Sequence, residues 1–341
     1  MTEISFFSEN SAMRLLLSIV QSAGLLFAGC LSLSIQAAGI QNITVPAQGD
    51  QPELSAVVWT PCAQAGGTLT VGSFELAGRK NCPLAGQNLP LVLISHGDSG
   101  SSIGHHDTAA ALADAGFVVA AVLHPGNNYA DHSRQSDLTI FDSRPRDISR
   151  LLDYLHQQWP QQRQLDKERS GVLGFSRGGY TALALIGAVP DKTASNSRFC
   201  APWWSFMLSH CRQLMDETLQ LRPQSDGRFK AAVVLDPLNL FGNNSYDKVQ
   251  VPVQLWASEL GGDSVELAHI EAIKAGLPQS PDYHVAKGAG HFVFLSPCPP
   301  ALAAEAEQIC TDPAGINRAA FHRQLNSHVV RFFHEKLRSI N

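Results

Sequence analysis

The sequence predicts an α/β fold, with a mostly parallel central sheet and helices on both of its faces. Short apolar runs such as Leu91–Ser95 and Phe117–Leu123 recur along the chain, which is typical of strands buried on both sides. Segments with apolar residues at helical spacing, such as Arg146–Gln158, separate these runs. The alternation favours strand–helix–strand units, and 341 residues that are 44% hydrophobic suffice for a large core.

The elements follow from local patterns. Residues 40–90 are expected to be antiparallel and irregular, because one strand, Ser55–Thr60, is ended by Pro61 and followed by clusters of glycine and proline. The regular part begins after Pro90. Its expected strands are Leu91–Ser95, Phe117–Leu123, Ala231–Leu235, Val251–Trp256 and Tyr283–Ala286, and its expected helices are His105–Ala115, Arg146–Gln158, Ser264–Ala275 and Asn317–Leu337.

A further strand and helix flank a motif of specific chemistry. Residues 171–179 read Gly-Val-Leu-Gly-Phe-Ser-Arg-Gly-Gly, which places Ser176 within a Gly-x-Ser-x-Gly pattern between an apolar run and a small-residue helix. This context is typical of a nucleophile elbow, a sharp turn that presents a serine hydroxyl. Gly174 and Gly178 suit such a turn because a Cβ would collide with neighbouring chain. The pattern predicts Ser176 as a nucleophile.

A serine hydroxyl is a weak nucleophile and needs a general base. Among 13 histidines, His291 stands out because it follows the last short strand in Gly288-Ala-Gly-His291. The glycines would let a loop carry the imidazole over the elbow. Its position after Ser176 also agrees with the chain order Ser…Asp/Glu…His. His291 is therefore the predicted base.

The imidazole requires a carboxylate on its other nitrogen. Asp263 is favoured, because it follows the Val251–Trp256 strand, where most folds of this type carry the acid, and a Gly-Gly pair would let it reach inward. Asp236, which closes the preceding strand, is the alternative; it would otherwise bond its local turn beside Pro237. Glu259 is a third candidate.

An oxyanion needs backbone N–H donors. The sequence predicts one from Arg177, directly after the nucleophile, and one from Asp98 in the loop after the Leu91–Ser95 strand, with Ser99 as its alternative. His96 precedes this donor and is expected to order the loop. His105-His106-Asp107 resembles a metal cluster, but no further ligands stand at suitable spacing, so a helix-start role is favoured.

Residues 1–38 predict a secretory signal peptide. The segment between Arg14 and Asp50 has no charge, Leu15–Leu33 is largely apolar, and cleavage is expected near Ala37 or Ala38. The mature chain would then be periplasmic or secreted.

Other interpretations of this segment stay open. Met13 would make a more conventional start, Cys30 ends a weak lipoprotein-type site, and the apolar stretch could remain as an anchor, although its serines and Gln21 disfavour a permanent span. Residues 39–341 are expected to form one catalytic domain.

Cysteine usage agrees with export. Of seven cysteines, Cys30 falls in the leader, and an even set in an exported chain indicates disulfides. Six cysteines allow 15 pairings, so the sequence does not decide among them. No CxxC spacing occurs, which disfavours zinc. The six cysteines other than Cys30 form three couples that are close in sequence: Cys62/Cys82, Cys200/Cys211 and Cys298/Cys310.

Residues 190–228 interrupt the strand–helix rhythm. The segment is clipped by the Cys200/Cys211 couple and carries Phe199, Trp203, Trp204, Phe206 and Met207. Its place between the elbow helix and the next strand suits either a cap lining an apolar pocket or ordinary packing of an insertion.

The net charge of −5 and the absence of Lys/Arg runs argue against nucleic acid as a partner. The predicted chemistry itself involves no cofactor and no metal.

Four motifs together resemble the α/β-hydrolase superfamily: Ser95-His-Gly, Arg144-Pro-Arg-Asp-Ile, Gly-Phe-Ser176-Arg-Gly-Gly and Gly-Ala-Gly-His291-Phe. Over residues 50–337 the chain is most similar to the bacterial predicted dienelactone hydrolase group, which resembles platelet-activating-factor acetylhydrolases. It departs from true dienelactone hydrolases, whose nucleophile is cysteine.

The resemblance implies an α/β-hydrolase fold and a secreted or periplasmic serine esterase with a small-molecule ester substrate. In the acetylhydrolase relatives the acid lies one strand earlier, which matches Asp236 and keeps that residue open. Two alternatives remain: the same triad acting on amide or C–C bonds, and a binding protein that keeps the fold without turnover.

Overall fold

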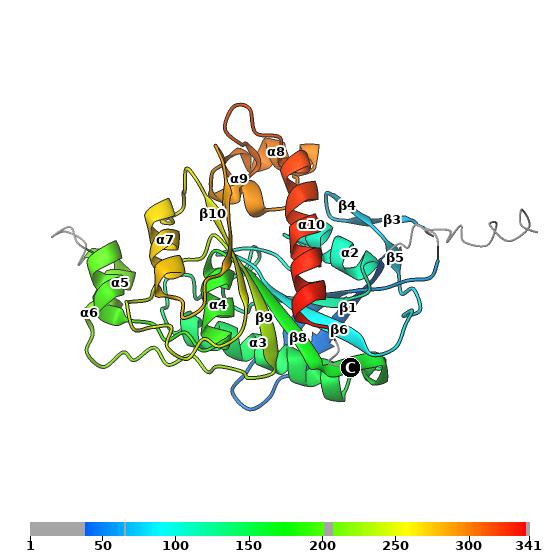
Figure 1. The fold of residues 1–341 in the computed structure, drawn as a ribbon, viewed down its shortest axis with the longest axis horizontal. Coiled ribbons are helices and arrows are strands. Elements are labelled where there is room, and N and C mark those ends of the chain that lie inside the picture. Colours follow the sequence, from blue (N-terminus) through cyan, green and yellow to red (C-terminus); the bar gives the residue numbers. More distant parts are fainter. Residues whose placement is uncertain (1–37, 65, 201–206, 339–341) are drawn as a thin grey trace, which may run out of the picture. The chain divides into compact units, whose positions relative to one another are not determined.

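The computed structural model describes residues 38–64, 66–200 and 207–338, which belong to one compact unit of residues 36–341 (Figure 1). Its centre is a nine-stranded sheet. The strands are β1 (Gly39–Val45), β2 (Leu54–Thr60), β5 (Arg79–Lys80), β6 (Leu89–Ser95), β7 (Val118–Leu123), β8 (Leu165–Phe175), β9 (Phe229–Leu235), β10 (Val253–Ser258) and β11 (Asp282–Ala286). A separate hairpin joins β3 (Thr68–Val71) and β4 (Phe74–Ala77).

The sheet order is β11-β10-β9-β8-β6-β7-β2-β1-β5. All neighbours from β11 to β7 pair in parallel, whereas β2 pairs antiparallel with both β7 and β1. The expectation of a mostly parallel sheet preceded by an antiparallel part is confirmed. Since the parallel strands all point the same way, the loops after β6, β8, β9, β10 and β11 meet at one edge.

Helices cover both faces of the sheet (Figure 1). On β6, Leu91 and Leu93 join one core with α3 (Ile140–Gln157), α4 (Arg177–Leu185) and α7 (Leu267–Gly276). Val92 and Ile94 point the other way and join a second core with α2 (His106–Asp114) and α10 (Arg318–Lys336). This alternation is the two-residue period of a strand buried on both sides.

Two helix starts differ from the sequence expectation. Helix α3 begins at Ile140 rather than Arg146 and takes Pro145 into its body. Proline removes one backbone bond there, and the burial of Ile140, Phe141 and Arg144 holds the preceding turn in place. Helix α7 begins at Leu267 rather than Ser264, because a tight turn over residues 262–265 occupies the chain before it.

The remaining helices are short. The insertion at 190–228 contains α5 (Lys192–Phe199) and α6 (Ser209–Met215), while Trp203, Trp204 and Phe206 lie outside the described residues. The described residues also form two 3₁₀ turns, η1 (Gln162–Gln164) and η3 (His291–Phe294), and the helices α8 (Pro300–Glu305) and α9 (Glu307–Cys310).

The three sequence-local cysteine couples are disulfide-bonded, with Cα–Cα distances of 5.7 to 5.9 Å. Residues 1–37 of the predicted signal segment, including Cys30 and Ala37, lie outside the described residues, whereas its last residue, Ala38, is described and buried. No helix in the described part of the chain has both the length and the apolar character that a membrane crossing requires.

Candidate active site

Ser176 occupies a strained turn between β8 and α4. Its backbone angles are φ 55° and ψ −118°, in a region that non-glycine residues rarely adopt. Surrounding chain holds it there: the Ser176 amide donates to the Leu235 carbonyl at 3.0 Å, and its carbonyl accepts from the Leu238 amide at 3.0 Å. The turn is therefore braced by the neighbouring strand β9.

The glycines of the motif are required by close backbone approach. A Cβ on Gly174 would lie 1.9 Å from the Gly178 carbonyl oxygen, and a Cβ on Gly178 would lie 1.9 Å from the Ser95 carbonyl oxygen. No side chain tolerates such contacts, which agrees with the steric reason for these glycines inferred from the sequence.

His291 lies in the loop after β11, where its backbone amide donates to the Gly261 carbonyl at 2.8 Å. Its ring stacks on Phe175 with centroids 4.6 Å apart, which brings the imidazole beside the residue that precedes Ser176. The side chain is 1% exposed, and its Nε2 has no hydrogen-bond partner among the described residues. The Nε2 atom of His291 is therefore available to accept a proton next to the elbow.

The carboxylate that meets the imidazole is Asp236. This residue is fully buried at the end of β9, and its Oδ2 lies 2.6 Å from His291 Nδ1. The Ser258 backbone amide donates to Asp236 Oδ1 at 2.9 Å, and the Ser258 hydroxyl to Oδ2 at 2.6 Å. Because donors surround it, the carboxylate acts as an acceptor, so Nδ1 carries the proton and Nε2 a lone pair.

The carboxylate hydrogen-bonded to His291 is that of Asp236, the alternative, and not that of Asp263, the acid favoured from the sequence. Asp263 is exposed, at a corner of the tight turn in which Gly262 and Val265 exchange backbone hydrogen bonds of 2.9 Å. The Gly-Gly pair was expected to let Asp263 reach inward, but it serves this turn instead. Asp236 lies closer to the elbow, because β9 is the direct neighbour of β8, which ends just before Ser176.

Glu259, the third candidate, belongs to a different contact. It accepts from Lys287 Nζ at 2.9 Å and from the Gly288 amide at 2.7 Å. Ser258, which supports Asp236, was not singled out from the sequence. Serine after a strand is too common to mark such a role.

The loop after β6 lies against the elbow. A Cβ built on Gly97 would be 3.3 Å from the Ser176 Cβ, so the loop backbone passes close to the serine. The Asp98 and Arg177 side chains form an ion pair with 3.0 Å between Oδ1 and Nη1. Their backbone amides donate to no other group within the described residues. Ser99, the alternative donor, has φ 49° and shares a 3.2 Å hydrogen bond with His132.

His96 orders this loop, in agreement with the expectation. Its Nδ1 donates to the Gly97 carbonyl at 2.7 Å, and its Nε2 accepts from the His124 amide at 3.2 Å. Burial, with the charge of Arg144, holds the pKa of His96 well below its usual value. The ring is therefore neutral at pH 7, and both nitrogens are occupied.

The His105-His106-Asp107 triplet lies at the start of α2, as expected. Asp107 Oδ2 lies 2.7 Å from His322 Nδ1 on α10, and His322 Nε2 bonds the Val293 carbonyl at 2.8 Å. Burial alone would raise the pKa of Asp107, but hydrogen bonds from His322, Ser296 and Asn326 outweigh it and lower that pKa well below its usual value. The triplet thus joins two helices to the segment that carries His291.

One group among the described residues brings potential metal ligands together: Cys200, His210 and Cys211, with ligand atoms within 4.8 Å of one another. Both sulfurs are joined in a disulfide, and a metal would need the free thiolates.

No protein-family model and no curated protein sequence matches the chain. Among solved structures, it is similar to a ferulic acid esterase from Streptomyces cinnamoneus, at 19% identity and a TM-score of 0.61 over 92% of both chains. The likeness confirms the expected fold class, the α/β-hydrolase fold. The closer resemblance to the dienelactone hydrolase and acetylhydrolase group stays a prediction.

Proposed function

We propose that this protein is a serine hydrolase of carboxylic esters, in which Ser176 is the nucleophile, His291 the general base and Asp236 the orienting acid. The observation that supports this best is the 2.6 Å hydrogen bond between Asp236 Oδ2 and His291 Nδ1. It leaves Nε2 unpartnered beside a strained elbow, which is the arrangement a general base needs.

The reaction follows from these positions. Ser176 Oγ attacks the ester carbonyl while His291 Nε2 takes the hydroxyl proton, and the carbonyl π electrons move onto its oxygen. The Asp98 and Arg177 amides, free of other acceptors, would hold this oxyanion. When it collapses, the C–O bond breaks and the alcohol leaves with the proton from His291. Water then repeats the sequence and releases the carboxylic acid.

Asp236 contributes through its hydrogen bond to His291 Nδ1. It fixes the Nδ1–H tautomer and stabilises the imidazolium that forms during each proton transfer. The two hydrogen bonds from Ser258 hold the carboxylate in this orientation.

The test is Ser176→Ala. We expect hydrolysis of p-nitrophenyl acetate to fall by at least ~10³-fold and labelling by a fluorophosphonate probe to disappear, because the attacking oxygen is removed. Ser149→Ala is a matched control on α3, where the hydroxyl bonds Asp226 at 2.8 Å. Its activity should equal that of the wild type. Undiminished labelling of a folded Ser176→Ala variant would reject the proposal.

The substrate class is tested with the wild-type protein. A panel of acyl esters of graded chain length, with methyl ferulate included because of the structural neighbour, should show turnover of at least one carboxylic ester. If the protein cleaved amides but no ester, the proposed ester hydrolysis would be wrong and amide hydrolysis by the same triad would be favoured.

We further propose that the enzyme is exported, with a signal peptide removed near Ala37 or Ala38. Three disulfides support this location, since such bonds persist in oxidising compartments. The N-terminal residue of the mature protein, determined by mass spectrometry, checks it; retention of residues 1–36 would contradict cleavage.

A further inference from the structure

Arg144 on α3 is an arginine buried to 1% exposure, beneath the loop that follows β6. Its guanidinium donates to Asn127 Oδ1 at 2.6 Å, to the Ser95 hydroxyl and the Thr181 hydroxyl at 3.4 Å each, and to the His96 carbonyl. A charged group is rarely buried among neutral acceptors, so this placement calls for a physical reason.

Two of these acceptors lead directly to the oxyanion donors of the proposed function. The His96 carbonyl belongs to the backbone just before Asp98. Asn127 accepts a hydrogen bond from Arg144, and its Nδ2 donates to Asp98 Oδ1 at 2.6 Å, so Asn127 links Arg144 to Asp98. Asp98 Oδ1 in turn pairs with Arg177 at 3.0 Å. A continuous chain of hydrogen bonds therefore runs from Arg144 to both residues whose amides would bind the oxyanion.

The same helix makes a second contact with this loop. Asp147, one turn after Arg144, lies 2.9 Å from His124 Nδ1, and His124 Nε2 lies 2.9 Å from the Ser95 hydroxyl. The array has the composition of a catalytic triad, but Ser95 and His124 are completely buried, so no substrate reaches the hydroxyl. Its effect is to tie the end of β6 to α3.

The charges in this region leave Arg144 positive. Burial, with the charge of Arg177, lowers the pKa of Arg144 to about 9, so the guanidinium is protonated at pH 7. Burial raises the pKa of Asp147 to about 7 despite Arg144. Burial also keeps His124 neutral. The positive charge of Arg144 thus lies beneath the loop that would receive negative charge.

We propose that Arg144 is a positioning residue that sets the oxyanion donors, holding the His96 backbone directly and the Asp98–Arg177 pair through Asn127. The inference rests on the proposed function and deepens it. It gives a role to the Arg144-Pro-Arg-Asp147 motif, which the proposed triad does not use.

If Arg144 only anchored α3, its replacement would lower stability alone. If it positions the oxyanion donors, its replacement also slows the chemical step. Donors that stabilise an oxyanion act in the transition state, so their displacement lowers kcat and leaves KM almost unchanged. A trifluoromethyl ketone reports the same geometry, because Ser176 adds to its carbonyl and forms an oxyanion without a leaving group. Its affinity should fall in parallel with kcat/KM.

The experiment compares Arg144→Lys with the wild type on p-nitrophenyl acetate and on the trifluoromethyl ketone. Lysine keeps the charge but cannot reach several acceptors at once. We expect kcat to fall by about 10²-fold, KM to change by less than about 3-fold, and inhibitor affinity to fall by about 10²-fold.

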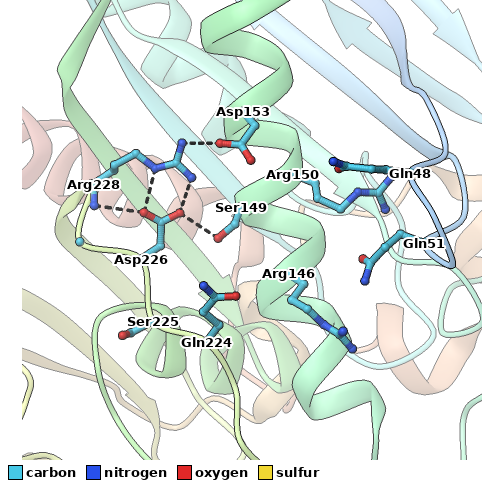
Figure 2. A pocket seen from close by; sticks show the side chains of 11 residues that line it. Gln48, Gln51, Arg146, Ser149, Arg150, Asp153, Gln224, Ser225, Asp226 and Arg228 are labelled. Carbon is cyan, nitrogen blue, oxygen red and sulfur yellow. Dashed lines mark hydrogen bonds and ion pairs between the residues drawn. The ribbon is translucent and has the colours of Figure 1, made fainter.

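Arg150 is the matched control (Figure 2). It also lies on α3, is 9% exposed and donates to backbone carbonyls, those of Pro46 and Pro52 at 2.9 Å, in the connection between β1 and β2. The pocket it lines with Arg146, Asp153 and Arg228 contains neither Ser176 nor His291. Arg150→Lys should lower the melting temperature without changing kcat or inhibitor affinity.

If Arg144→Lys does not fold, Asn127→Ala tests the same chain of contacts, with an expected fall in kcat of at least about 10-fold. A folded Arg144→Lys or Asn127→Ala variant with wild-type kcat and inhibitor affinity would overturn the inference. Equal losses in the Arg144 and Arg150 variants would overturn it as well. A wild-type protein inert to esters and to the fluorophosphonate probe would instead reject the proposed function, and the inference with it.

Discussion

Asp236 and Asp263 follow neighbouring strands, and the sequence favours Asp263 as the acid, yet the surroundings of the two residues differ completely. Asp236 is fully buried and bonded to His291 and Ser258, whereas Asp263 is exposed at the corner of a turn. A buried carboxylate held by donors keeps both its charge and its orientation, which is what a triad acid requires. An exposed one beside a turn is free to rotate and is solvated.

This difference predicts opposite outcomes for two asparagine variants. Asp236→Asn should lower kcat by about 10⁴-fold, because the amide favours the wrong tautomer of His291. Asp263→Asn should change kcat by less than about 3-fold. Steady-state rates on p-nitrophenyl acetate check both. The assignment fails if the Asp263 variant is the slower of the two.

At the scale of elements, α2 and α10 are joined to the 3₁₀ turn η3 by one polar cluster. Asp107 accepts from His322 at 2.7 Å and from Asn326 at 2.8 Å, and His322 also bonds the Val293 carbonyl. Val293 follows His291 by two residues, so the two helices support the segment that carries the imidazole. The cluster is therefore expected to contribute stability that depends on the charge of Asp107.

The pH dependence follows from the lowered pKa of Asp107. A carboxylate whose pKa is lower in the folded state stabilises the fold above its unfolded value of 3.8, and this contribution is lost as the pH falls through and below that value. Asp107→Asn should therefore lower the free energy of unfolding by about 2 kcal/mol at pH 7. The difference from the wild type should shrink at pH 3.

Urea unfolding at the two pH values measures this difference. Asp50→Asn, at an exposed position in the connection between β1 and β2, is the control and should shift stability by less than about 0.5 kcal/mol. A loss for Asp107→Asn that is equally large at pH 3 and pH 7 would contradict the charge-based account.

At the scale of the whole molecule, a two-sided core and three disulfides stabilise the fold. The disulfides close short loops, with sequence separations of 20, 11 and 12 residues. Each connects segments outside the parallel strands of the sheet: the chain before β6, the insertion after α4, and the segment between η3 and α10. They therefore add a covalent constraint to segments that the parallel strands do not hold.

Loop closure predicts the size of this effect. The variant with Cys62→Ser and Cys82→Ser should lose about 3 kcal/mol of unfolding free energy, because the unfolded chain regains the entropy of an open loop. Denaturant unfolding of the variant against the oxidised wild type measures it. Reduction of the wild type should cause a larger loss of unfolding free energy than this variant shows, since it opens all three loops. An unchanged midpoint would contradict a stabilising role for this bond.

The sequence alone was sufficient wherever the signal is local. The order of the main strands and helices after Pro90, the glycine-flanked elbow at Ser176 and the loop of His291 follow from patterns within about ten residues, because strand period, helix spacing and turn sterics act at that range. Local cysteine spacing likewise suggested pairs that the structure contains.

Only the tertiary structure selected Asp236, which is 55 residues from His291, and revealed the contacts of Arg144 with residues 17 and 48 positions away. Both depend on which strands are neighbours and which loops meet at one edge of the sheet. Strand order and loop position are set by the packing of the whole sheet, and they produce no periodic pattern in the sequence.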